Sequence, residues 1–359
     1  MISFNILANP NWKRGLHPFY RWKNQLENNG IKVQIYFSHK DKRLRNSDNI
    51  FIFSRYFEQG WQNIQKRTPE NESELIKYLS DLKNYAGELI WFDEAASSGS
   101  ADFPIIGHVD KFVKKQVLKK MDYYKEPVNT ADLRIWVNST IKQTQVTPFI
   151  PCPANELHKI KAGWNTSVYD YRYIRNRLMP ISNYLSYKIY SPRYTDINAK
   201  RNLDVAFRGT TAYKNNIEVS LQRNKIITIL NDIDLKIAQG RRITKAKYFK
   251  ELQSAKISLS PFGFGEICYR DFETFIAGAI LVKPSLDHLT TYPNVFIPNE
   301  TYIPVSWDLT DLQEKIEDIS INYNQYKDIA RNGQNRFKTL LNNSEYFVEA
   351  INRILDRTF

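Results

Sequence analysis

The segment from Ser260 to Pro284, SPFGFGEICYRDFETFIAGAILVKP, combines residue types that suit a phosphate and a sugar. Gly263 and Gly265 lie between a strand-like stretch and a helical pattern. Glycines at such a turn let backbone amides approach a phosphate, and the following helix adds partial positive charge. Arg270 can add a forked full charge, and Glu273, one turn later, suits the two hydroxyls of a ribose. The segment therefore predicts a site for a phosphorylated sugar donor.

Two runs of alternating strands and helices would position this segment. The first run has predicted strands at 3–8, 32–37, 49–54, 88–92, 105–106 and 134–138, and helices at 17–28, 72–85 and 109–123. Residues 150–195 interrupt the rhythm, which restarts with strands at 203–208, 235–238, 257–260 and 280–283 and helices at 218–230, 245–254, 270–277, 310–322 and 343–357. Strands separated by helices predict a parallel sheet covered on both faces, and two such halves place a ligand between them.

The Ser260 segment also resembles the donor-binding half of GT-B fold glycosyltransferases, especially the group-1-like and exostosin-like C-terminal domains. The shared pattern is a Ser-Pro, a glycine loop, a helix with Arg and Glu, and an Ala-Gly turn before an apolar strand. The resemblance covers residues 203–320, including WDLTDLQEKIEDI, whereas over residues 1–150 only the alternating pattern matches. It implies an α/β GT-B fold, with two Rossmann-like domains facing across a cleft.

The domain boundaries and the activity follow from that resemblance. We expect an acceptor-binding domain at 1–180, a nucleotide-sugar-binding domain at 181–342, and a C-terminal helix at 343–359 that packs back toward the first domain. The implied reaction moves a sugar from a nucleotide-sugar donor to a hydroxyl group of a glycan or lipid-linked glycan, in surface polysaccharide or glycoconjugate synthesis. The motifs do not specify the base, the sugar, the acceptor, or retention against inversion.

The resemblance assigns roles to single residues as well. Glu273 would bind the ribose, and Glu266 would lie nearest the transferred sugar; a carboxylate favoured by the helix dipole is the alternative for Glu266. Many members place these two glutamates eight positions apart, whereas here they are seven apart. Arg208 and Lys214 would bind the diphosphate, so neither a metal ion nor another cofactor is expected. The predicted donor-binding residues are Arg208, Gly209, Thr210, Lys214, Arg241, Ser260, Gly263, Gly265, Tyr269, Arg270 and Glu273.

A base that activates the acceptor hydroxyl is expected in the first half of the chain. Asp93 and Glu94 follow the strand ELIWF and precede the small residues AASSGS. Asp93 is the first choice, with helix capping as its alternative role. His108 follows a further short strand and could act as base, hydrogen-bond the sugar or be structural, and Arg55 could contact acceptor or phosphate. The catalytic candidates are therefore Asp93, Glu266 and His108.

Composition and charge narrow the location and the partners. The 359 residues carry a net charge of +13 and two cysteines, which do not make a disulfide framework. Without a signal-peptide layout or a long apolar run, we expect a cytoplasmic protein. Lys and Arg are spread along the chain with no nucleic-acid motif, so nucleic acid is not an expected partner. The basic run at 111–120 could instead meet an anionic membrane surface peripherally.

Two other classes of protein remain as alternatives. A metal-dependent GT-A transferase would use Asp232 and Asp234 as an Asp-x-Asp pair that holds a divalent ion, although a loop role suits their place between a helix and a strand better. A non-catalytic nucleotide- or polyanion-binding protein would need neither Asp93 nor Glu266. A hydrolase has no support, because the chain contains neither a Gly-x-Ser-x-Gly elbow nor a His-Glu-x-x-His motif.

Overall fold

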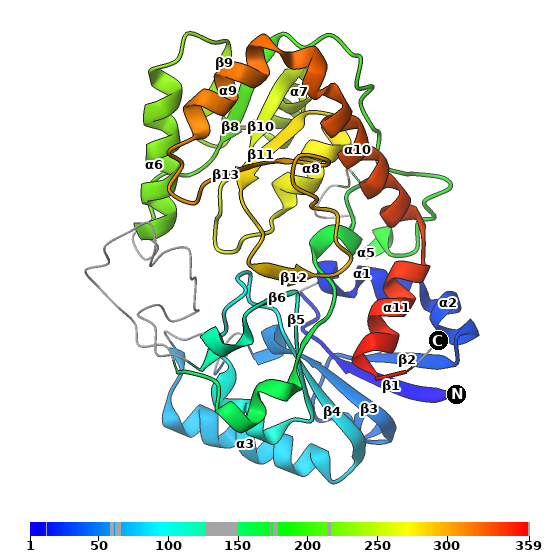
Figure 1. The fold of residues 1–359 in the computed structure, drawn as a ribbon. Coiled ribbons are helices and arrows are strands. Elements are labelled where there is room, and N and C mark those ends of the chain that lie inside the picture. Colours follow the sequence, from blue (N-terminus) through cyan, green and yellow to red (C-terminus); the bar gives the residue numbers. More distant parts are fainter. Residues whose placement is uncertain are drawn as a thin grey trace.

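The computed structural model describes residues 1–11, 13–57, 61, 66–125, 150–172, 174, 179–213 and 217–357. Figure 1 shows two layered halves, one above the other, with both ends of the chain beside the lower half. The lower half contains the first part of the chain, and the upper half contains the second part. Each half is built around a parallel sheet whose strands alternate with helices along the chain.

The first sheet has the order β2-β1-β3-β4-β5-β7 in the described part of the chain, and all neighbouring strands are parallel. Helices α1, α2 and α3 pack around it. Trp164 stacks on Phe92 with 4.6 Å between ring centroids, which shows how fully aromatic rings fill this core. The bounds are β1 (Ile2–Leu7), α1 (Lys13–Arg21), α2 (Lys23–Asn28), β2 (Ile31–Tyr36), β3 (Ser47–Phe53), α3 (Pro69–Lys83), β4 (Ala86–Asp93), β5 (Lys111–Lys114) and β7 (Ile160–Ala162).

The second sheet has the order β13-β11-β10-β8-β9, again with parallel neighbours in the described residues. Helices cover both faces, because Val205 of β8 packs with α6 and α9 whereas Ala206 packs with α7. The predicted α/β class with two Rossmann-like halves is confirmed. The bounds are β8 (Leu203–Arg208), α6 (Ile217–Asn231), β9 (Ile237–Gly240), α7 (Lys245–Ser254), β10 (Ala255–Leu259), α8 (Tyr269–Ala277), β11 (Ile280–Pro284), β13 (Ile303–Val305), α9 (Leu312–Ile321) and α10 (Tyr323–Asn342).

Two features join the halves. Strand β6 (Gln116–Leu118) from the first half pairs antiparallel with β12 (Leu289–Thr291) from the second, and this ribbon lies between the two sheets in Figure 1. Helix α10 then leads down to α11 (Glu345–Ile354), which lies against the lower half (Figure 1). There the ring of Phe347 contacts the rings of Phe19 and Trp164, at centroid distances of 5.0 and 5.2 Å. The end of the chain thus packs on the first half.

The helix predicted at 109–123 is wrong. This stretch forms β5 and β6, and Lys111 and Lys114 are buried in ion pairs instead of lying on a solvated helix face. Lys111 pairs with Glu88 and Lys114 pairs with Asp93, each at 2.6 Å between nitrogen and oxygen. These partners come from β4, which lies beside β5, and their charges allow lysines to occupy a central strand. Lys111, Lys114 and Lys115 therefore lie inside the protein, whereas Lys119 and Lys120 at the end of the run are exposed.

Other local predictions differ as well. The stretch 105–106 lies in a 3-10 helix instead of a strand, and the strand predicted at 134–138 lies outside the described residues. The long helix α10 was not predicted. None of the described helices combines the length and the apolar character needed to cross a membrane. The remaining short helices are η1 (Lys42–Arg45), η2 (Ser54–Phe57), η4 (Phe103–His108), η5 (Met121–Tyr124), η6 (Ala154–Lys159), η7 (Thr166–Val168) and α5 (Met179–Ser182).

Candidate functional site

The carboxyl edge of the second sheet brings the two predicted donor loops together. Strands β8 and β10 are parallel neighbours, so the loop after Arg208 and the loop after Leu259 leave the sheet side by side. Arg270 links them, because its guanidinium donates to the backbone carbonyls of Arg208 and Leu259. Arg270 therefore holds the backbone of both loops at this edge.

Arg223 on α6 lies between the same two loops and was missed in the sequence. A Cβ atom on Gly209 or Gly263 would lie 3.6 or 3.4 Å from its guanidinium nitrogens, which places the guanidinium directly beside both glycines. Its Nη1 donates to the carbonyl of Thr210 at 2.8 Å and to the hydroxyl of Tyr213 at 3.0 Å. The only sequence signal for Arg223 was its positive charge in the helix after the first strand of this half, and such a charge is common on any helix.

Arg208 and its neighbours form the outer part of this edge. Glu251 on α7 accepts two hydrogen bonds from the Arg208 guanidinium, at 2.8 and 2.9 Å. The third contact of that guanidinium is the carbonyl of Gln239. Arg241 follows β9 at the same edge and is exposed. Lys214 lies outside the described residues.

Glu273 occupies a polar cluster built by α7 and α8. Burial raises the pKa of its carboxyl group, and Lys245, the Tyr248 hydroxyl, Arg270 and Arg14 oppose that rise. Burial also lowers the pKa of Lys245, although the Glu273 charge counteracts it. A partly buried carboxylate surrounded by cations and a phenol can accept hydrogen bonds from the hydroxyls of a ligand.

Ser260 lies inside the protein and is bound by other side chains. Its hydroxyl donates to Asp271, and the same carboxylate accepts from the backbone N–H of Cys268 at 2.9 Å and from the Lys283 ammonium group at 2.6 Å. All these atoms belong to the loop before α8, its first turn, or the neighbouring strand β11. The network fixes where the glycine loop ends and where α8 begins.

Gly265 and Glu266 touch the first half directly. A Cβ atom on Gly265 would lie 1.7 Å from the carbonyl oxygen of Ala96, so only a glycine permits this approach. The fully buried Glu266 accepts hydrogen bonds from the backbone N–H and hydroxyl of Ser98, at 2.9 and 2.7 Å. Burial would raise the pKa of Glu266, but the nearby His288 ring, whose Nε2 lies 3.9 Å from the carboxylate, and the hydrogen bonds from Ser98 outweigh burial and lower it to about 2. The structure thus places Glu266 in the contact between the halves.

The first sheet also presents its carboxyl edge to this contact. Asp93, only 1% exposed, receives the Lys114 ammonium group at 2.6 Å. Glu94, the next residue, is fully buried; its carboxylate accepts from the backbone N–H of Arg55, and its carbonyl accepts from Lys115 at 2.7 Å. Burial lowers the pKa of Lys115 to about 8, while the Glu94 charge opposes the shift. The Asp93 carboxylate is therefore paired with a lysine, whereas the Glu94 carboxylate accepts from the backbone of Arg55.

Arg14 and a group of tyrosines connect the two edges. The Arg14 guanidinium lies over the ring of Tyr269, 4.9 Å from its centroid. Tyr269 in turn packs against Tyr169 at 6.1 Å between centroids, and burial raises the pKa of Tyr269 while Arg14 and Arg55 lower it. Glu94 acts on the same phenol by its charge. We call this place, where Arg14, Arg55, Glu94, Tyr169 and Tyr269 meet the Glu273 cluster, the domain junction.

Three predicted residues lie at the amino edges of the sheets, away from the carboxyl edges that meet at the domain junction. His108 ends a short helix just before β5 begins, so it lies at the amino edge of the first sheet. Asp232 and Asp234 are exposed and precede β9 at the amino edge of the second sheet. Within the described residues, no three His, Cys, Asp or Glu side chains converge as a metal site would require. The structure therefore does not bring these three residues to the domain junction.

Two Rossmann-like halves whose carboxyl edges face each other form the GT-B arrangement, the fold class predicted from the sequence. No family model and no curated protein matches the chain. Among solved structures, the chain is similar to HepE of Anabaena in complex with UDP and glucose, with 10% identity, a TM-score of 0.46 and coverage of 100% of both chains. T4 phage beta-glucosyltransferase gives 10% identity and a TM-score of 0.46, covering 99% of this chain and 100% of that one. An alpha1,3-fucosyltransferase gives 12% identity and a TM-score of 0.42, covering 100% of this chain and 91% of that one.

Proposed function

We propose that the protein is a glycosyltransferase that moves a sugar from a nucleotide-sugar donor to a hydroxyl group of a glycan or glycolipid acceptor. The observation that carries the proposal is the domain junction, where cations and a carboxylate from the second half meet a buried acid from the first. Because two parallel sheets converge there with their carboxyl edges, the place matches where ligands bind in open α/β folds. Function is argued from these residues, since the similar structures share so little sequence.

The donor would lie on the second half. The backbone amide at Thr210, together with the Arg223 guanidinium, would hold the diphosphate, and Glu273 would accept hydrogen bonds from the ribose hydroxyls. Arg223 and Arg241 supply positive charge for the leaving nucleotide without a metal ion. Arg208 contributes less directly, because Glu251 already occupies both sides of its guanidinium fork.

Glu94 is the residue we propose as base for the acceptor hydroxyl. Its charge reaches Tyr269 across the junction, whereas the Asp93 carboxylate faces Lys114 inside the first half. The Glu94 carboxylate accepts a hydrogen bond from the backbone N–H of Arg55, and a carboxylate of this kind is the group that a general base requires. Asp93 then acts by positioning Lys114 and the loop after β4.

A screen of nucleotide sugars by thermal shift tests the proposal. UDP-, GDP-, ADP- and CMP-sugars are each added to the wild-type chain, to Glu273→Gln and to Glu300→Gln, a matched change at an exposed glutamate. We expect one donor class to stabilise the wild type and Glu300→Gln clearly more than Glu273→Gln, with EDTA leaving the shift unchanged. If none of these donors stabilises the wild type, the proposal fails. Stabilisation without any turnover would instead support the non-catalytic alternative.

A further inference from the structure

Strand β2 forms an open edge of the first sheet. In the described part of the chain it pairs only with β1, so its other side has no neighbouring strand. The carbonyls of Gly30 and Tyr36 accept hydrogen bonds from β1, at 2.7 and 3.0 Å. Because these contacts alternate along a parallel ladder, the N–H and C=O groups of Val33 and Ile35 point to the open side. An edge of this kind is a template for another strand.

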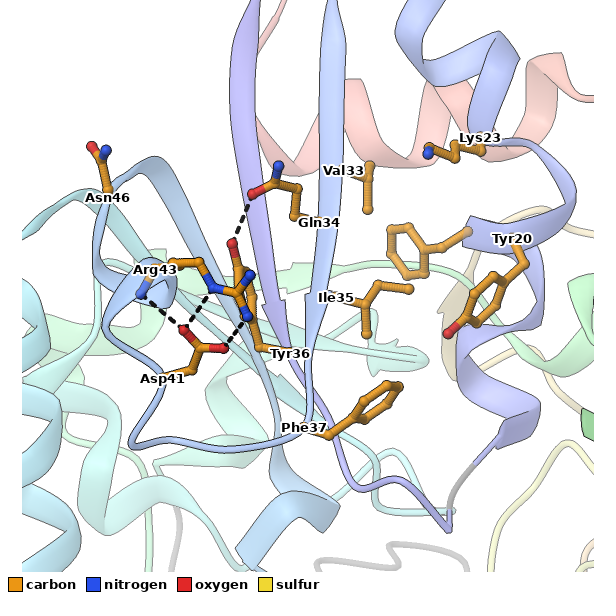
Figure 2. A pocket seen from close by; sticks show the side chains of 11 residues that line it. Tyr20, Lys23, Val33, Gln34, Ile35, Tyr36, Phe37, Asp41, Arg43 and Asn46 are labelled. Carbon is orange, nitrogen blue, oxygen red and sulfur yellow. Dashed lines mark hydrogen bonds and ion pairs between the residues drawn. The ribbon is translucent and has the colours of Figure 1, made fainter.

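A hollow of about 730 Å³ follows this edge. Five consecutive residues, 33–37, line it, although neighbouring residues of a strand point to opposite faces of the sheet. A single hollow can border all five only if it lies along the hydrogen-bonding edge. Figure 2 shows Val33, Ile35 and Phe37 on the side of Tyr20, and Gln34 and Tyr36 on the side of Arg43. The space therefore has the position that a seventh strand would take beside β2 in this six-stranded sheet.

We propose that this edge pairs with the same edge of a second copy of the chain, in antiparallel register centred on Gln34. In that register Val33 lies opposite Ile35 of the second copy, and both residues turn their free backbone groups toward the partner strand. The side chains of this pair fall on the same face and are both branched and apolar, which is a favourable cross-strand pair. The six-residue length of β2 is ordinary for a paired strand.

Charge favours this occupant. In the proposed register Lys32, the one charged residue of β2, lies opposite Tyr36 of the second copy, and Gln34 lies opposite Gln34. No like charges meet between the strands. The two cations that line the hollow each lie beside a carboxylate, Arg43 beside Asp41 at 2.7 Å and Lys23 beside Glu27 at 3.8 Å. Self-pairing along β2 thus places no like charges directly opposite each other.

The rim of the hollow continues into an exposed apolar surface. Phe37 is 45% exposed, and the ring of Tyr20 contacts that of Tyr184, which is 80% exposed, at 6.0 Å between centroids. Ile181, in the same connecting stretch, is 62% exposed. Exposed rings and aliphatic side chains beside an open strand are typical of a surface that another molecule covers. A second copy docked on β2 would cover this surface in a two-fold arrangement that closes, leaving neither β2 edge free.

Sedimentation velocity of the full chain over a wide concentration range tests the pairing. We expect a dimer for the wild type and at least about tenfold weaker dimerisation for Ile35→Pro, which removes an outward N–H without removing a bond to β1. Ile35→Lys, which places a charge in the hollow, should weaken the dimer as strongly. The control Ile321→Lys changes a residue that is 81% exposed on α9 and should dimerise like the wild type.

Thermal melts of each variant separate lost pairing from lost folding. A folded Ile35→Pro or Ile35→Lys variant that sediments as a monomer supports the proposal. A wild type that stays monomeric at the highest concentration overturns it, as would be expected if the edge binds a peptide or a lipid instead. A dimer that neither Ile35 variant weakens also overturns it. The measurement involves no nucleotide sugar, so its outcome is independent of the proposed function.

Discussion

Arg14 of the first half lies over the ring of Tyr269 in the second half, with its guanidinium 4.9 Å from the ring centroid. Tyr269 begins α8, the helix that carries Arg270 and Glu273, and Arg14 also lowers the pKa of Glu273. One side chain from the start of the chain is therefore coupled to both ends of the first turn of α8. We infer that α8 keeps its place at the domain junction partly through this contact.

Arg14→Met should loosen the junction without unfolding either half. The change removes a cation–π contact of about 0.5–1 kcal/mol and a charge beside Glu273. We expect a small fall in melting temperature and a weaker apparent affinity for the nucleotide donor, measured by calorimetry and titration. Arg331→Met, at an exposed arginine on α10, is the control and should change neither. Equal donor affinity in the two variants would show that Arg14 has no part in the site.

Glu266 should stabilise the protein in a pH-dependent way. Its pKa falls from 4.5 to about 2 on folding, so the folded state favours the ionised form. The resulting stability, about 3 kcal/mol, is complete above pH 4.5 and is lost as the pH falls toward 2. Denaturant unfolding of the wild type and Glu266→Gln should therefore differ most near neutral pH and converge in acid. A difference that does not depend on pH would contradict this role.

Gly265→Ala should disturb the close contact between Gly265 of the second half and Ala96 of the first. The new methyl group would overlap the carbonyl of Ala96, 1.7 Å away, and backbone must move to admit it. We expect a loss of about 1–3 kcal/mol in the free energy of unfolding. Gly107→Ala is the matched control, because no atom lies within 4 Å of its added Cβ. Calorimetry that finds both variants equally stable would refute the contact.

Asp93 and Lys114 should behave as a structural pair. Asp93→Asn leaves the buried Lys114 charge without its carboxylate, which costs about 3–5 kcal/mol. The double change Asp93→Asn with Lys114→Met should recover part of that loss, and a double-mutant cycle by denaturant unfolding measures the coupling. Additive effects of the two single changes would mean that the pair contributes nothing, and Asp93 would return as a candidate base.

The sequence predicted the strand and helix alternation, and it placed Arg208 and Gly263 in loops that do meet at one sheet edge. Those predictions depend on local patterns, which a single sequence carries. The contact of Glu266 with Ser98 joins residues 168 positions apart, and no local pattern encodes it. The same holds for Lys111 and Lys114, which read as a solvated face because their buried partners lie on another strand.

The choice between Asp93 and Glu94 as candidate base shows most clearly what a single sequence cannot predict. Asp93 ends β4 and Glu94 follows it, and neighbouring residues in an extended chain point to opposite sides. Which side faces the second half depends on how the two sheets are placed, and that placement depends on contacts such as Gly265 with Ala96. Arg223 was missed in the sequence for a similar reason. Its place between the loops at Gly209 and Gly263 depends on how those two loops pack, which the residues around Arg223 do not indicate.

Release of the nucleotide from a donor sugar tests the central claim most directly. The assay follows nucleotide formation from the donor that best stabilises the wild type, comparing Glu94→Gln, Glu273→Gln and the control Glu300→Gln. We predict that Glu94→Gln lowers turnover by about a hundredfold or more with donor binding retained, as loss of a general base would, and that Glu273→Gln mainly weakens binding. Full turnover in both variants, or none in the wild type with any donor, would contradict the account.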